Sequence, residues 1–177
     1  RYSGSHYPRT VALFGDSHAH AAYYGFQEQM KNLNTNVVLL GNTTCPPFIG
    51  AEIGFTDLEK SLYCKERIEQ ALDIIKSKND IKEVYYFSRG PIYITGKSFG
   101  DLEKILQPPH PISPDIFFSS LQQSINLLNE NGKKVYYVTE NPELEFSPVK
   151  CIPRAIHITE TNCMLEKKRV MDRQYKY

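Results

Sequence analysis

Short apolar runs alternate with longer amphipathic segments along the chain. The apolar runs are rich in β-branched and aromatic residues and cover residues 10–14 (TVALF), 36–40 (NVVLL), 83–87 (EVYYF) and 134–139 (KVYYVT). Continuous apolar runs of this length are typical of strands that are buried on both faces of a sheet. The pattern therefore predicts buried strands at these four places.

The segments between the predicted strands have helical spacing, since apolar residues recur every three or four positions. The helical faces comprise Ala19, Ala22, Tyr23, Phe26 and Met30; Ile68, Leu72 and Ile75; and Phe117, Leu121, Ile125 and Leu128. Ser113 and Pro114 provide an N-cap and a first-turn proline for the last helix, with Asp115 following, and Gly132 stands where its C-terminus is expected.

The resulting order, β-α-β-α-β-α-β, predicts an α/β fold with three layers, a mostly parallel sheet flanked by helices. Ligands of such sheets gather at the carboxyl ends of the strands. The 177 residues suffice for one domain with a sizeable core, so we expect a single domain over 1–177. The pattern becomes irregular after Pro142, and a helix predicted from about Met164 still continues at Tyr177. We expect this domain to be a fragment that lacks its C-terminal part.

Charge and hydropathy exclude several partners. The chain has 21 basic and 20 acidic residues and no run of Lys or Arg longer than three residues, which argues against a nucleic-acid partner. No stretch approaches the roughly 18 to 20 apolar residues of a membrane span, and no signal peptide is predicted within these 177 residues.

The four cysteines, Cys45, Cys64, Cys151 and Cys163, form no Cys-x-x-Cys pair and no zinc-type spacing, so no metal site is predicted. An even number of widely spaced cysteines is compatible with two disulfides and an oxidising compartment. Buried free thiols are the alternative.

Candidate chemistry follows the first predicted strand, at Gly15, Asp16, Ser17 and His18. A serine at this turn exposes its hydroxyl beside the N–H groups of the first helical turn, which suits a nucleophile whose reaction creates an oxyanion. Asp and Ser are also favoured N-caps, so a purely structural role for either residue is the alternative.

The segment LFGDSHA resembles the first block of the SGNH (GDSL-like) hydrolase superfamily, whose fold is flavodoxin-like. With His18 it is most similar to the SGNH domains fused to acyltransferase-3 membrane proteins, which O-acetylate bacterial surface polysaccharides. NVVLLGNTTCPP resembles the second strand of that subgroup and places Gly41 at the oxyanion position, next to Asn42. EVYYFSRG and KKVYYVTENPELEFSPVKCIPR are similar to its later strands and loops.

The resemblance implies that Ser17 is the nucleophile of an acetyl transfer to a cell-surface carbohydrate such as lipopolysaccharide, with Gly41 in the oxyanion hole and Asp16, His18 and Asn42 near the site. It implies no cofactor. The implied partners are an acyl donor, a polysaccharide or lipid-linked glycan acceptor, and a fused integral-membrane acyltransferase domain. The domain would be periplasmic and tethered to the inner membrane. The alternatives are a carbohydrate esterase or deacetylase and a non-catalytic glycan-binding domain.

The sequence departs from the superfamily in its third block, where Arg89 stands in place of an oxyanion-donating Asn. A guanidinium always donates hydrogen bonds, so Arg89 is a candidate for an oxyanion or substrate contact. An ordinary salt-bridged arginine at a strand end is the alternative.

A second departure concerns the base, since no Asp of the chain has a His three positions on. His18 diverges from Ser17 by about 100 degrees on a helix, and His20 is predicted to point elsewhere. His6 lies in the leading tail, and His110 and His157 are best read as loop residues. The resemblance implies a base beyond Tyr177, so we expect these 177 residues alone to hydrolyse p-nitrophenyl acetate very poorly.

In the same subgroup the equivalent cysteines lie in extracytoplasmic domains, which implies the pairs Cys45–Cys64 and Cys151–Cys163; the two crossed pairings remain open. The tyrosines of the strands, Tyr85, Tyr86, Tyr136 and Tyr137, are expected in the core or in cross-strand pairs. Tyr23, Tyr24 and Tyr93 are the aromatic candidates for contact with a glycan.

Overall fold

Parallel strands form a sheet at the centre of the computed structural model, which describes residues 7–50, 57–96, 111–139, 141–142, 151 and 163–174. The strands are β1 (Arg9–Gly15), β2 (Thr35–Gly41), β3 (Ile81–Phe87) and β4 (Lys134–Val138), in the order β2-β1-β3-β4. β1 is central and pairs with β2 on one side and β3 on the other. The four predicted strands are confirmed, each within two residues of its expected bounds. β4 is not buried as predicted, because it lies at the edge of the described sheet and its residues are half-buried or exposed.

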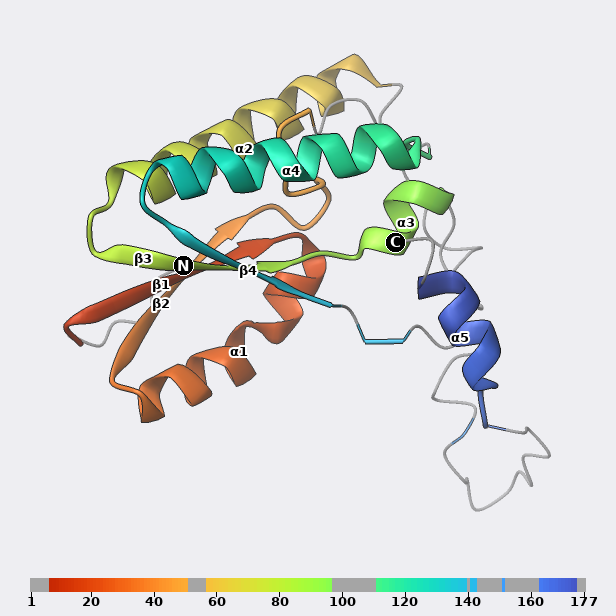
Figure 1. Ribbon diagram of the computed structural model, residues 1–177, viewed down its shortest axis with the longest axis horizontal. Coiled ribbons are helices and arrows are strands. Elements are labelled where there is room, and N and C mark those ends of the chain that lie inside the picture. The colour runs from red at the N-terminus through yellow and green to blue at the C-terminus, as the bar shows by residue number, and fades with distance from the viewer. Residues whose placement is uncertain are drawn as a thin grey trace.

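Helices cover both faces of this sheet (Figure 1). α1 (Ser17–Asn32) lies on one face, and α2 (Leu58–Ser77) and α4 (Pro114–Glu130) lie together on the other. The predicted three-layer α/β fold is therefore confirmed, and its arrangement is flavodoxin-like.

Successive side chains of β1 point to opposite faces of the sheet, and because those from Val11 to Phe14 are all apolar, both faces must be covered by helices. Val11 and Leu13 pack against Ala19 and Tyr23 of α1, whereas the intervening Ala12 and Phe14 belong to the cluster that α2 and α4 bury. All four of these strand residues are inaccessible to solvent. A strand that is buried on both faces has a continuous apolar sequence, as TVALF does in the central strand of this sheet.

The ends of α4 follow the expected chemistry. The Ser113 hydroxyl accepts a hydrogen bond from the backbone N–H of Ile116, Pro114 opens the first turn, and Gly132 follows the helix with a φ of 71°. The predicted C-terminal helix is also present, as α5 (Lys167–Gln174), and begins three residues after Met164. A short helix that the apolar pattern did not predict, α3 (Gly90–Thr95), follows β3.

Two disulfides link Cys45 to Cys64 and Cys151 to Cys163, which confirms the pairing that the resemblance implied. Tyr85 and Tyr136 stack across neighbouring strands with ring centroids 4.8 Å apart, and Tyr86 is fully buried. The strand tyrosines are thus core and cross-strand residues, as expected. Among the described residues, no helix combines the length and the apolar character needed to cross a membrane.

Candidate active site

The turn between β1 and α1 consists of Asp16 alone, and Asp16 is the N-cap of α1. Its Oδ1 accepts a hydrogen bond of 2.9 Å from the backbone N–H of His18. Ser17 is the first residue of the helix and is exposed, and its hydroxyl has no hydrogen-bond partner among the described residues. Asp16 therefore does the capping, and the Ser17 hydroxyl faces solvent at the carboxyl end of the central strand.

Close backbone approach requires glycine at two places beside Ser17. Gly15 lies opposite Gly41 of β2 and opposite Phe87 of β3. A Cβ on Gly15 would collide with the Phe87 carbonyl oxygen, and a Cβ on Gly41 would collide with the Gly15 carbonyl oxygen. Gly41 also has a φ of 106°, which L side chains rarely adopt. These contacts hold Gly41, at the end of β2, beside the end of β1, which leads through Asp16 to Ser17.

The second oxygen of Asp16 connects this turn to the end of β3. Oδ2 accepts hydrogen bonds from the backbone N–H of Arg89 and the hydroxyl of Tyr93, each at 2.7 Å, and from the Ser88 hydroxyl at 3.4 Å. The backbone N–H of Asp16 donates to the Phe87 carbonyl at 3.3 Å. Only 1% of Asp16 is exposed, so this carboxylate replaces its lost hydration with protein donors.

This network limits what Arg89 can do. Arg89 is the N-cap of α3 and is half-buried, and its backbone N–H is already donated to Asp16. Any contact of Arg89 with an oxyanion or a substrate must therefore come from its guanidinium.

The segment after Gly41 is attached to α2. Asn42 donates from Nδ2 to the Tyr63 hydroxyl at 2.9 Å, and its Oδ1 accepts from the Thr44 backbone N–H at 3.1 Å. The disulfide between Cys45 and Cys64 adds a covalent link between the same two elements, and both cysteines are fully buried. Asn42 thus anchors the loop that directly follows the candidate oxyanion glycine.

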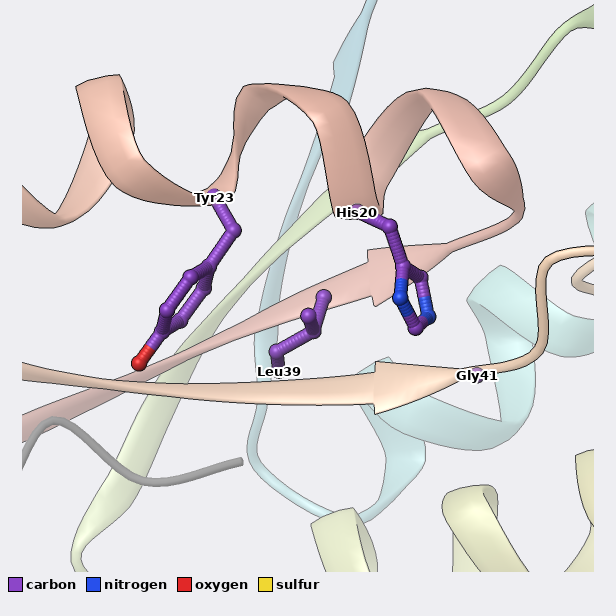
Figure 2. A pocket seen from close by; sticks show the side chains of 4 residues that line it. All are labelled: His20, Tyr23, Leu39 and Gly41. Atoms are coloured by element: carbon purple, nitrogen blue, oxygen red, sulfur yellow. The ribbon is translucent and has the colours of Figure 1, made fainter.

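A pocket of about 390 Å³ lies on the α1 side of β2 and is lined by His20, Tyr23, Leu39 and Gly41. Figure 2 shows the His20 ring pointing from α1 toward the carboxyl end of β2, where Gly41 lies. The sequence predicts that His20 points away from Ser17, but the structure places its side chain in a pocket with Gly41. The three-residue spacing from Ser17 was the signal that could have found it, because residues three apart share a helix face.

Of the other histidines, only His18 lies within the described residues. His18 is half-buried beside Ser17, and its backbone N–H is bound by Asp16. His6, His110 and His157 lie outside the residues that the structure describes. Over those described ranges, no group of three or more His, Cys, Asp or Glu side chains could hold a metal ion.

The fold and the site define a class: flavodoxin-like α/β domains with an exposed serine at the carboxyl end of the central strand. A family model described as "SGNH domain (fused to AT3 domains)" matches residues 1–177. The chain belongs to this family, as the resemblance in its strand ends predicted. No curated protein matches the chain. Family membership makes it a domain of hydrolase or acyltransferase type, whose family is fused to AT3 domains.

Proposed function

We propose that this domain transfers acetyl groups to a carbohydrate of the bacterial cell surface, with Ser17 as the nucleophile. The observation that carries the proposal is the exposed hydroxyl of Ser17, just after the end of β1. This hydroxyl does not cap α1, because Asp16 is the N-cap. The Ser17 oxygen forms a bond to the acetyl carbonyl carbon, the donor's leaving group departs, and a base takes the serine proton. A sugar hydroxyl then attacks the acyl-enzyme, gives up its proton and restores Ser17.

Backbone N–H groups of Ser17 and Gly41 are the proposed oxyanion donors. Ser17 occupies the first position of α1, where a backbone N–H has no partner within the helix. Gly41 is held opposite Gly15 by register and by contacts that exclude a side chain. Donors that are fixed before the reaction stabilise a developing charge without reorganisation, which supports this pair.

We also propose that the domain is extracytoplasmic and acts with a fused membrane domain that delivers the acyl group. The two disulfides support an oxidising compartment. Fusion to AT3 domains within the family supports a membrane acyltransferase as the partner. In this arrangement the inner membrane tethers the domain, and the acceptor is a polysaccharide or a lipid-linked glycan.

Ser17→Ala in the full-length protein tests the proposal, with glycan acetylation as the measurement. The expected result is a loss of at least about 100-fold, because no other group would form the acyl-enzyme. Ser119→Ala is the matched control, since Ser119 is an exposed serine of α4 whose hydroxyl only bonds the Ile116 carbonyl. Unchanged acetylation by Ser17→Ala would instead favour a non-catalytic glycan-binding domain.

Labelled acetate trapped on Ser17 separates transfer from hydrolysis. The acyl-enzyme is offered first water and then glycan, because both reactions share this intermediate and differ only in what attacks it. We expect faster release of acetate to the glycan. Equal release to water would identify a carbohydrate esterase.

A further inference from the structure

The pocket between α1 and β2 is larger than an acetyl group requires. Its volume of about 390 Å³ lies within the range of small-molecule sites, about 300 to 1,000 Å³. A two-carbon acyl group would leave most of this space unfilled. The pocket therefore suits a larger part of a substrate.

The lining indicates an uncharged ligand. Leu39 and Tyr23 line one side of the pocket and belong to the buried cluster between β1, β2 and α1. His20 is exposed, and its imidazole can donate and accept hydrogen bonds. None of the four described lining residues is Lys, Arg, Asp or Glu, so these residues offer a phosphate-bearing donor no fixed countercharge. A sugar ring, with an apolar face and a rim of hydroxyls, matches this combination.

The pocket lies on the face of α1 that also carries the nucleophile. His20 lies three residues after Ser17, on the same face of α1 and less than one helical turn away. Gly41 lines the other side of the pocket at the end of β2 (Figure 2). A ring bound between His20 and Leu39 would therefore lie on the same helix face as Ser17.

We propose that this pocket binds the uncharged pyranose ring of the acceptor, and that His20 hydrogen-bonds a hydroxyl next to the one that is acylated. This assignment rests on the proposed acetyl transfer and adds an acceptor subsite to it. His20 is then a specificity residue for the acceptor and has no part in forming the acyl-enzyme.

The first test measures binding without turnover. Full-length protein carrying Ser17→Ala is titrated with methyl α-D-glucopyranoside, galactopyranoside and mannopyranoside, and binding is followed by ligand-observed saturation-transfer NMR. His20→Trp fills the pocket and is expected to weaken the best of these ligands at least about tenfold, equivalent to about 1.4 kcal/mol. Ala21→Trp is the matched control, because Ala21 is the exposed neighbour of His20 and does not line the pocket.

The second test compares two reactions of the enzyme with Ser17 intact. His20→Trp is expected to lower transfer to the bound glycoside about tenfold, and to lower it more than hydrolysis of p-nitrophenyl acetate. His20→Ala leaves the pocket open and is expected to lower transfer about fivefold through the lost hydrogen bond. Because His20→Ala adds no bulk, it still tests the assignment if His20→Trp disturbs folding.

Three outcomes would overturn the assignment: no binding of any of the three glycosides, equal binding in His20→Trp and Ala21→Trp, or equal loss of transfer and hydrolysis. The last would place His20 in acyl-enzyme formation. Failure of the proposed function is seen separately, as acetylation that survives Ser17→Ala, and does not affect the NMR measurement.

Discussion

The buried carboxylate of Asp16 accepts a hydrogen bond from the backbone N–H of Arg89 at 2.7 Å. Because Asp16 also caps α1, one side chain joins the start of the helix that carries Ser17 to the end of β3. Tyr93 adds a third element through its hydroxyl. The orientation of Ser17 therefore depends on contacts more than 70 residues away in the sequence.

Replacing Asp16 by alanine is expected to lower the free energy of unfolding by about 2 to 4 kcal/mol, because a cap is lost and buried donors lose their acceptor. Urea denaturation measures this change. Asp57→Ala is the matched control: Asp57 caps α2 through its side chain but is exposed, and about 1 kcal/mol is expected there. Equal losses in the two variants would mean that the hydrogen bonds from Arg89 and Tyr93 add nothing.

Gly41→Ala is expected to destabilise the domain by about 2 kcal/mol or more, since the new methyl group meets the Gly15 carbonyl and the backbone φ is unfavourable. Gly25→Ala in α1 provides the comparison. A Cβ at Gly25 meets nothing within 4 Å, and the change should stabilise the helix by about 0.5 to 1 kcal/mol. Thermal unfolding of both variants measures the difference, and a neutral Gly41→Ala would contradict the close approach of β1 and β2.

Thiol titration under denaturing, non-reducing conditions should find no free cysteine, because all four are paired. Replacing Cys45 and Cys64 together by serine should cost about 2 to 4 kcal/mol of stability. The same replacement should lower acetylation, because the loop after Gly41 then depends on the hydrogen bond between Asn42 and Tyr63. Four titratable thiols would refute both the pairing and the oxidising compartment.

Stability should fall as the pH rises from about 10 toward 12. Burial and the hydrogen bond from its hydroxyl to Glu83 raise the pKa of Tyr85 to about 12. The folded state thus favours the neutral phenol. The resulting contribution to the free energy of unfolding is complete below the unfolded pKa near 10, and it is lost as the pH rises toward the folded pKa of about 12. Burial raises the pKa of Tyr86 in the same direction.

Tyr85→Phe checks this prediction, since phenylalanine cannot ionise. Urea midpoints measured from pH 9 to 12 should decline less steeply in Tyr85→Phe than in the wild type. Tyr24→Phe is the control, because Tyr24 is 61% exposed and lies outside the sheet. A decline that is the same in all three proteins would show that Tyr85 is not responsible.

Local pattern was sufficient for most of the fold. β1 was recognised because burial on both faces leaves no polar position from Val11 to Phe14. α4 was bounded by Ser113, Pro114 and Gly132, whose backbone preferences act locally. α3 was missed because its six residues are too few to show a period. Its buried Ile92 and Tyr93 make it depend on packing.

The sequence by itself determined the layered fold, the place of Ser17 directly after the first strand, and the family, because each follows from residues that are neighbours in the chain. Tertiary structure decided that Asp16 rather than Ser17 is the cap, that the backbone N–H of Arg89 is already bound, and that His20 faces a pocket with Gly41. The physical reason is that these relationships join β1, β2, β3 and α1 across the sheet. Such contacts exist only once parallel strands bring their carboxyl ends to one edge.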